Sequence, residues 1–181
     1  LAVTGHAQRT LPMTSLPLSI RPETPSDEAA IDRLHQRAFG PGRFARTAYR
    51  LREMAGDEAV FGFTAHVGTF LVGSVRVTPV QAGEVSAAML GPLTVDPAFE
   101  GKGIGGALMT RAIEESPLRG IELILLVGDL PYYSRFGFQP AEHFGIATDD
   151  NQYHVALQAY VLQPGALQNA QGRFQEDVAY H

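Results

Sequence analysis

The sequence contains no cysteine among its 181 residues. This absence excludes disulfide bonds, thiolate metal sites and a cysteine nucleophile within the printed chain. A chain without cysteine is also compatible with the reducing environment of the cytosol. We therefore expect a cytoplasmic protein.

Long hydrophobic runs and clustered positive charge are also missing. No segment approaches the roughly 20 apolar residues of a membrane span, and residues 1–18 lack the apolar centre of a signal peptide. The formal net charge is -5 and no cluster of Lys and Arg stands out, which disfavours nucleic acid and anionic membranes as partners. We expect neither partner, and the sequence leaves the oligomeric state open, a homodimer included.

Histidine spacings typical of metal sites are absent as well. None of the six histidines stands in an HxH or HExxH pattern. They occur at His6, His35, His66, His143, His154 and His181. The sequence therefore predicts no metal site.

The residues that are present describe an ordinary globular chain. Apolar residues make up 45% and charged residues 18% of the sequence, and the length suits one well-buried core rather than two. We expect a flexible N-terminal arm over residues 1–17, one domain over residues 18–172 and a C-terminal tail over residues 173–181.

Hydrophobic periodicity predicts alternating helices and strands along this domain. The expected helices cover residues 26–39, 44–54 and 103–117, with a short helical turn at 131–136. The expected strands cover residues 18–22, three runs between 60 and 95, 121–127, a segment from 137, and 154–162. The short connections between the three central runs predict antiparallel pairing, and the continuous apolar run 121–127 is typical of a strand buried on both faces.

The segment FEGKGIGGAL, residues 99–108, has four glycines within six residues and then continues into good helix formers. Free backbone N–H groups at the start of a helix form a concave array of donors for phosphate oxygens, and Lys102 adds a cation. The Walker pattern GxxxxGK followed by Ser or Thr is absent, which excludes a nucleoside triphosphate loop of that type.

A dinucleotide fingerprint, GxGxxG, is formally present at Gly101, Gly103 and Gly106, with Asp129 at the end of the next strand as a ribose-binding acid. In a Rossmann unit the first glycine follows the strand almost directly, whereas here five residues separate Val95 from Gly101. The preceding strands are also predicted to be antiparallel. An NAD(P)-binding oxidoreductase therefore stays as an alternative hypothesis.

Two segments together resemble the GCN5-related N-acetyltransferase (GNAT) superfamily, and within it a predicted YhbS-like subgroup. The first is LGPLTVDPAFEGKGIGGALM, a strand followed by a glycine loop and a helix; the second is YYSRFGF, residues 132–138. The resemblance implies a single-domain α/β (α+β) fold with a mixed, mostly antiparallel twisted sheet of about six to seven strands flanked by helices, in the order βααβββαβαβ. One departure is Glu100, where the family's first signature usually has Gln or Arg.

The resemblance implies acetyl-CoA as the cofactor and an amine-bearing acceptor as the second substrate. It implies that the strand ending at Val95 and the strand 121–127 diverge to admit the pantetheine arm, and Gly91-Pro92 suits a bulge there. By motif match, Tyr133 is the general acid toward the coenzyme sulfur, while Tyr132 packs in the core or lines the cleft. The implied cofactor-binding residues are Leu93, Thr94, Val95, Glu100, Gly101, Lys102, Gly103, Ile104, Gly105 and Gly106.

The general base is not fixed by the sequence. Four residues have a suitable side chain: Glu84, His66, His35 and Asp96. We expect an N-acetyltransferase that acts by direct attack of a primary amine in a ternary complex. A CoA-binding regulatory protein with little turnover is the alternative that shares the same fold.

Overall fold

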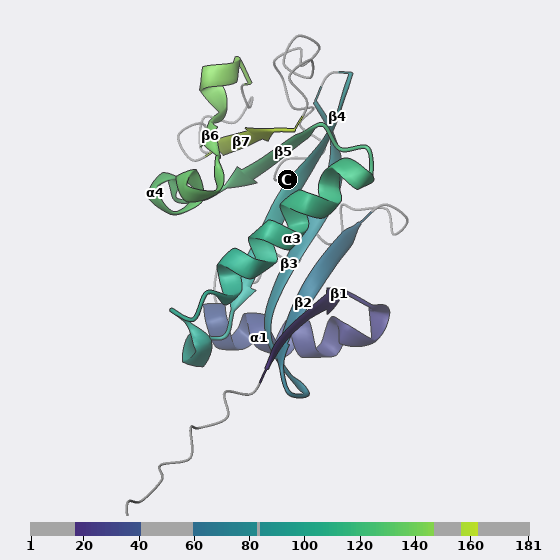
Figure 1. The fold of residues 1–181 in the computed structure, drawn as a ribbon, viewed down its shortest axis with the longest axis vertical. Helices are drawn as coiled ribbons and strands as arrows, with labels where there is room; N and C mark the ends of the chain where they lie inside the picture. The colour runs from purple at the N-terminus through teal and green to yellow at the C-terminus, as the bar shows by residue number, and fades with distance from the viewer. Residues whose placement is uncertain (1–16, 41–59, 83, 147–156, 163–181) are drawn as a thin grey trace, which may run out of the picture.

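A seven-stranded sheet forms the centre of the computed structural model, which describes residues 17–40, 60–82, 84–146 and 157–162 (Figure 1). The sheet order is β1-β2-β3-β4-β5-β7-β6. The strands are β1 (Leu18–Pro22), β2 (Phe61–Val67), β3 (Phe70–Ala82), β4 (Val85–Val95), β5 (Leu123–Val127), β6 (Gln139–Pro140) and β7 (Leu157–Val161). The α-helices are α1 (Glu28–Phe39), α3 (Ile104–Leu118) and α4 (Leu130–Tyr133), and the 3₁₀ turns are η1 (Pro25–Asp27), η2 (Pro97–Phe99), η3 (Ser134–Phe136) and η4 (Ala141–Phe144).

The sheet is mixed and mostly antiparallel, as predicted. Strands β1 to β4 pair antiparallel in chain order, β4 and β5 are parallel, and β7 pairs antiparallel with β5 and β6. A turn of two residues joins β2 to β3, and Gly68 in it has φ +60°, a conformation that favours glycine. The parallel pair needs a crossover, which α3 supplies.

Helices cover both faces of the sheet, α3 one face and α1 the other (Figure 1). The apolar face of α3 presents Ile104, Leu108 and Met109 to the main core. A Cβ at Gly73 of β3 would lie 2.9 Å from Leu108 and 3.0 Å from Ile104. Glycine at this position therefore lets the start of α3 approach the sheet closely.

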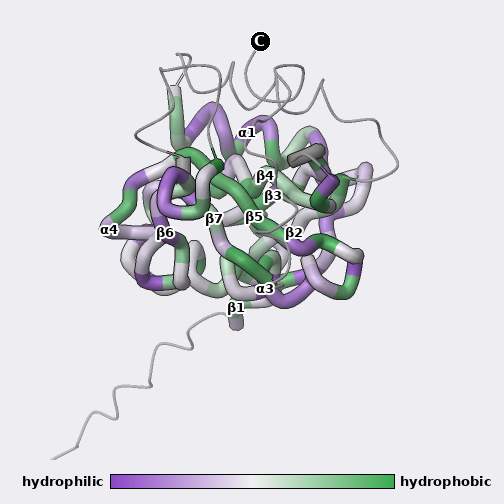
Figure 2. The backbone as a smooth tube through the Cα atoms, turned by 90° about the horizontal axis from the view of Figure 1, so that it is seen from above, coloured by the Kyte–Doolittle hydropathy of each residue, from purple (hydrophilic) through white to green (hydrophobic). Residues whose placement is uncertain are grey.

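Strand β5 is buried on both faces, which confirms the interpretation of its continuous apolar run. Ile124 and Leu126 join the core under α3, whereas Leu123 and Leu125 join the core on the opposite face. Figure 2 shows this strand as a hydrophobic stretch through the middle of the fold. Burial on both sides explains why the run lacks the polar alternation of the outer strands.

Several predicted boundaries differ from the structure. The helix expected over 26–39 begins with the 3₁₀ turn η1, in which the Asp27 amide donates to Thr24 O, three residues back, at 2.9 Å. Strand β5 begins at Leu123 rather than 121, because the Ile121 amide donates to Ser116 O at the end of α3. The predicted helix 44–54, residues 154–156 of the last strand, the arm up to residue 16 and the tail from residue 163 lie outside the described residues.

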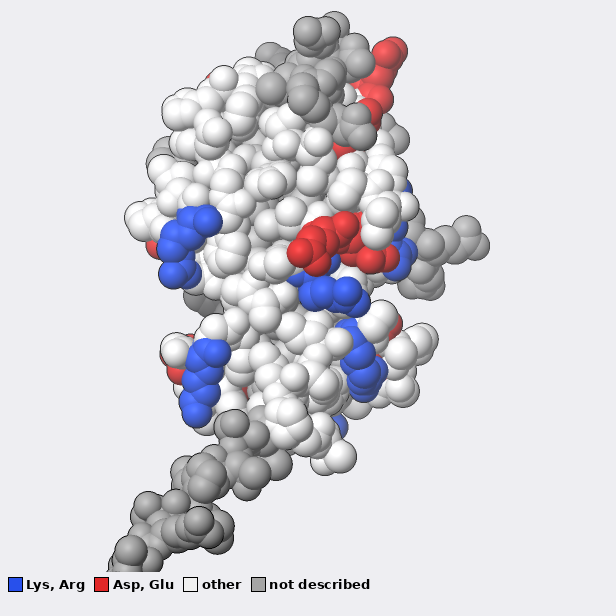
Figure 3. Space-filling view, in the orientation of Figure 1, with Lys and Arg blue, Asp and Glu red and all other residues white. Residues whose placement is uncertain are grey.

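Charged side chains of both signs lie side by side on the face seen in Figure 3. One pair of opposite charges joins Arg119, the C-cap of α3, to Glu115, with Nε to Oε1 at 3.3 Å. Among the described residues, no helix combines the length and hydrophobicity needed to cross a membrane. That part of the chain also holds no group of three or more side chains arranged to bind a metal ion.

Candidate active site

A cleft of about 730 Å³ is lined by residues of both α3 and α4. Figure 1 shows α4 to the left of α3. The cleft wall combines the end of β4, the glycine loop, the first turn of α3 and the α4–η3 segment. The lining residues are Leu93, Val95, Phe99, Glu100, Gly101, Gly103, Ile104, Gly105, Gly106, Tyr132, Tyr133, Arg135 and Phe136. Both sequence signatures therefore meet in one cavity, although 22 residues separate them in the chain.

Strands β4 and β5 diverge beside this cleft, as expected. They pair only where Ala87–Met89 lies next to Leu123–Leu125. Beyond Met89, β4 continues to Val95 with a strand partner on its β3 side alone. The other edge of β4 therefore offers backbone donors and acceptors to the cleft.

A bulge in β4 lies next to the point of divergence. Val77 pairs with Leu90 and Val75 pairs with Leu93, so Gly91 and Pro92 together stand opposite the single residue Arg76. Two residues opposite one is the pattern of a β-bulge, which bends the strand locally. The structure thus confirms the bulge expected at Gly91-Pro92.

The glycine loop presents main-chain donors to the cleft. Gly101 and Gly103 have φ values of +73° and +80°, and Gly103 is the N-cap of α3 without any side-chain cap. The amides of residues 104–106, in the first turn of α3, have no acceptor within the helix because of their position. These donors and the positive end of the helix dipole suit a phosphate group.

The missing side chains of the next two glycines keep the cleft open. A Cβ at Gly105 would lie 2.8 Å from the Tyr132 hydroxyl, and one at Gly106 would lie 3.7 Å from the ring of Phe136. A larger residue at Gly105 would therefore occupy the space between the helix and Tyr132. This cradle without Cβ atoms fits the diphosphate of a coenzyme.

Eight of the ten cofactor residues predicted from the sequence line the cleft, and two do not. Thr94 is 2% exposed and, by strand alternation, faces the opposite side of the sheet from Leu93 and Val95. Lys102 places its Nζ 5.8 Å from the centre of the Phe99 ring and is not part of the cleft wall. The acidic Glu100 does line the cleft.

Tyr133 is the last residue of α4 and lines the cleft. Its ring packs edge to face against the rings of Tyr132 and Phe138, with ring centres 4.9 Å and 6.2 Å apart. Gly128 packs so closely against this ring that any Cβ there would overlap it. Burial raises the pKa of the Tyr133 phenol, and the neighbouring Tyr132 and Asp129 raise it further.

Sequence reasoning missed Arg135, which supplies a cation to the cleft wall. Its guanidinium lies 4.6 Å from the centre of the Tyr132 ring, and Nε donates to Tyr132 O at 3.2 Å. Phe99 and Phe136 were also missed as lining residues. Their signal was available, since Arg135 and Phe136 lie inside the second signature, between Tyr133 and Gly137.

None of the four candidate bases lines this cleft. Asp96 accepts a hydrogen bond from Arg37 Nε at 2.8 Å, and Glu84 is exposed near the β3–β4 turn. His35 is buried on α1. His66 lies in a separate cavity, and burial lowers its pKa, as does the nearby Arg21. The described residues therefore assign no general base.

Comparisons with known proteins agree with this architecture. Residues 19–141, more than half of the chain, match the family model of the acetyltransferase (GNAT) domain. The chain therefore belongs to the GNAT acetyltransferase family.

Individual relatives resemble the chain over most of its length. It is 29% identical over 164 residues to the uncharacterized N-acetyltransferase YhbS of Escherichia coli K12, covering 90% of this chain and 95% of YhbS. A crystal structure of E. coli YhbS in complex with CoA is similar with a TM-score of 0.77 at 28% identity, covering 90% of this chain and 92% of that one. A GNAT acetyltransferase of Brucella melitensis in complex with acetyl-CoA has a TM-score of 0.68 at 26% identity, covering 92% and 97%.

Proposed function

We propose that the chain transfers the acetyl group of acetyl-CoA to a primary amine of a small molecule or peptide. The observation that carries this proposal is the meeting of two features in one cleft: the uncapped first turn of α3 and the unpaired edge of β4. The first suits a diphosphate and the second an extended arm that carries amide groups. The CoA and acetyl-CoA complexes of the two similar structures support the same ligand.

The chain's own groups divide the binding of acetyl-CoA between them. The amides of Gly103 to Gly106 would hold the diphosphate, with Arg135 as the nearby cation. The edge of β4 at Leu93 and Val95 would hydrogen-bond the pantetheine arm. A strand amide near Leu93 would donate to the thioester oxygen as negative charge develops there.

Bound acetyl-CoA would supply the acyl group in activated form, as a thioester. The cleft then acts mainly by holding the acyl carbon close to the amine in one complex, since positioning provides much of the rate of such transfers. The acceptor amine must be neutral to attack. The group that removes its proton has no assignment among the described residues.

Tyr133 is the proposed general acid. The burial that raises its pKa above the ordinary value of 10.0 keeps the hydroxyl protonated across the physiological range. A protonated phenol can give its proton to the sulfur as the carbon–sulfur bond breaks. Its hydroxyl makes no hydrogen bond with the described residues, so none of these residues competes for that proton.

Two alternatives predict different ligands or rates. The NAD(P) alternative fits the fold poorly, because β3 and β4 are antiparallel and η2 separates β4 from the glycine loop. A CoA-binding regulatory protein would keep the cleft but would not need Tyr133. Calorimetric titration with acetyl-CoA, CoA and NADH distinguishes the NAD(P) alternative from the proposed acetyltransferase. Binding of NADH alone would contradict the proposal.

A thiol-release assay over a library of amines tests the reaction itself. Tyr133→Phe should lower kcat with the best amine by about 100-fold, the order expected for loss of a general acid, with little change in acetyl-CoA affinity. Tyr132→Phe is the matched control and should retain more of the rate. If no amine releases CoA above the background rate, the regulatory alternative replaces the enzyme; if Tyr133→Phe keeps the full rate at every pH, the acid is another group.

A further inference from the structure

A second cavity, of about 220 Å³, lies between β1, α1 and the β2–β3 hairpin. It shares no lining residue with the cleft. Three guanidinium groups and one carboxylate line it: Arg21 comes from β1, Asp27 from η1, and Arg33 and Arg37 from α1. Guanidinium groups bind carboxylates and phosphates through planar pairs of N–H donors, so the lining is suited to an oxyanion.

Two of the three arginines already have carboxylate partners. Arg21 donates from Nη1 and Nη2 to the two Asp27 oxygens, at 3.0 and 2.8 Å. Arg37 donates from Nε to Asp96 Oδ2 at 2.8 Å and from Nη2 to Leu71 O at 3.3 Å. Asp27 and Asp96 are each 5% exposed, so these two pairs balance their charges next to the cavity.

Arg33 has no such partner. Its exposed side chain makes no hydrogen bond or ion pair with the described residues. Arg33 and Arg37 are four residues apart on α1, where side chains lie on one helix face and like charges repel by a few tenths of a kcal/mol. Among the described residues, no carboxylate pairs with the Arg33 guanidinium at this cavity, and the neighbouring Arg37 has further N–H donors besides those already bonded.

His66 adds an unsatisfied donor to the same wall. Its ring is 8% exposed, and Arg21 Nη2 lies 3.4 Å from Nε2. Because a guanidinium only donates, Nε2 must accept, and the proton of the neutral ring is then on Nδ1. Nδ1 is buried and has no partner within the described chain. A buried donor without an acceptor costs about 1–3 kcal/mol, so a water or ligand oxygen that reaches Nδ1 would stabilise the fold.

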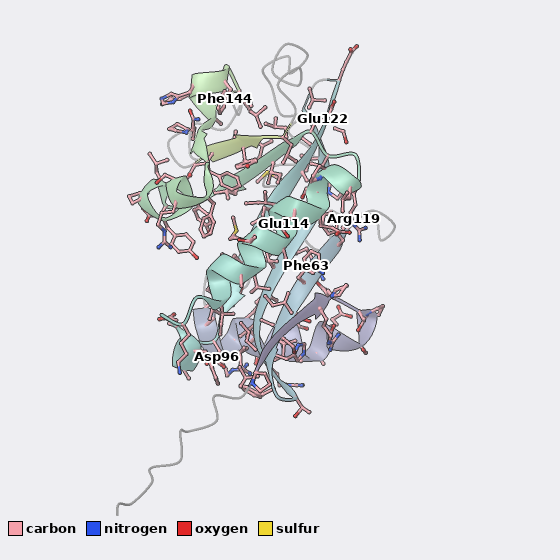
Figure 4. The ribbon with its side chains drawn as sticks, in the orientation of Figure 1. Phe63, Asp96, Glu114, Arg119, Glu122 and Phe144 are labelled. Carbon is pink, nitrogen blue, oxygen red and sulfur yellow. The ribbon has the colours of Figure 1, made fainter. Side chains whose placement is uncertain are left out.

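We propose that this cavity is a second binding site, for the carboxylate or phosphate group of a small anionic ligand. Arg33 and Arg37 supply the charged donors, Thr69 and His66 supply uncharged polar groups, and Phe70 forms an apolar wall. The site lies near the start of the glycine loop, because Arg37 holds Asp96 and Asp96 in turn caps the Ala98 amide at 2.9 Å. Figure 4 shows Asp96 where α1 meets the segment that leads into α3.

Site-resolved NMR titrations with sodium sulfate and sodium acetate test the proposal. Sulfate represents a phosphate group and acetate a carboxylate. Saturating CoA is added, so that neither probe occupies the glycine loop. We expect saturable shifts of the backbone amides of residues 30–37 and 66–71 with at least one probe, and the tighter probe identifies the ligand chemistry.

Variants make the test specific. Arg33→Gln should weaken binding of that probe by about tenfold, or about 1.4 kcal/mol. Arg33→Lys keeps the charge but loses the planar pair of donors, so its affinity for the probe should lie between those of the parent chain and Arg33→Gln. Arg119→Gln is the matched control, since Arg119 is the C-cap of α3 and pairs with Glu115. It should bind as the parent chain does.

Two results would overturn the second site. One is a linear, unsaturable response of the cavity amides to both probes; the other is equal affinity in the parent chain and Arg33→Gln. Arg33 is exposed on a helix, and thermal unfolding of the variant verifies that it folds. The amides of residues 101–106 report on the glycine loop separately. If CoA does not shift the amides of residues 101–106, the proposed function is contradicted. The oxyanion site is still judged separately, from the amides of residues 30–37 and 66–71.

Discussion

The cleft beside α3 and the cavity beside α1 use different chemistry for the same class of ligand. The cleft offers main-chain N–H groups from a glycine loop, with Arg135 as the cation in its wall. The cavity offers arginine side chains, two of them paired with buried carboxylates. The two sites are neighbours, because Phe70 of the cavity and Phe99 of the cleft have ring centres 6.3 Å apart.

This difference has consequences for stability and for binding. Backbone donors are fixed by the fold and bring no buried charge, so a cleft made from them is organised before the ligand arrives. Ion pairs need both partners, and loss of one leaves the other charge buried and uncompensated. We therefore expect substitutions in the cleft to act mainly on ligand binding and turnover, and substitutions around the cavity to act also on folding.

The largest effect is expected from Gly105→Val in the cleft. Its side chain would fill the space next to the Tyr132 hydroxyl, which lies 2.8 Å from the position of a Cβ. Acetyl-CoA affinity measured by calorimetry should fall about 100-fold, or about 2.7 kcal/mol. Ala107→Val is the matched control, because it places valine in the same helix two residues further on, at a position outside the cleft lining. Equal loss of affinity in both variants would contradict a ligand at the first turn.

A smaller effect on turnover is expected from Gly128→Ala. The new methyl group would overlap the Tyr133 ring and displace it, since Gly128 packs directly against that ring. We expect kcat to fall about 30-fold with little change in the KM for acetyl-CoA, because the diphosphate contacts lie on α3. Gly120→Ala is the control for destabilisation alone: its φ of +77° strains an alanine, but nothing lies within 4 Å of its Cβ, so the variant should lose stability and keep kcat. An unchanged kcat in Gly128→Ala would contradict a role of Tyr133 in the reaction.

The smallest effect is expected from Asp27→Asn beside the cavity, and it is an effect on stability. Burial alone would raise the pKa of Asp27, but hydrogen bonds from Arg21 and Thr24 outweigh it and lower the pKa below 3.8. A lowered pKa stabilises the fold above about pH 3.8, and this contribution is lost as the pH falls through the folded-state value. At pH 7 the variant should lose about 1–2 kcal/mol of unfolding free energy.

Urea unfolding from pH 7 down to pH 3 measures this loss. Glu28→Gln removes the same charge from an exposed position at the start of α1 and should change stability little. The gap between the two variants should narrow toward pH 3. A gap that is absent at pH 7, or that stays constant as the pH falls, would contradict the role of the Arg21–Asp27 pair.

Local patterns were sufficient to predict most of the fold and the centre of the cleft. The glycine loop was predictable because main-chain donors depend on glycines that are adjacent in the sequence. The buried β5 and the antiparallel β2 to β4 followed from apolar runs and short connections. The bulge at Gly91-Pro92 followed from the missing N–H of proline.

Side-chain direction and distant pairing were beyond those patterns. Thr94 lies inside the right segment, but strand alternation turns it away from the cleft, and Lys102 leans over Phe99 instead of the cavity. Arg37 and Asp96 are 59 residues apart, so no local sequence pattern predicts their hydrogen bond. The cavity beside α1 was missed for the same reason, because β1, α1 and β2 meet there only after folding.

A crystal structure of this chain with bound acetyl-CoA would show whether the first turn of α3 holds the diphosphate. We expect diphosphate oxygens about 3 Å from the main-chain nitrogens of Gly103 to Gly106, with the acetyl group in the gap between β4 and β5. Density for the diphosphate away from the first turn of α3, for example against the arginines beside α1, would contradict this placement.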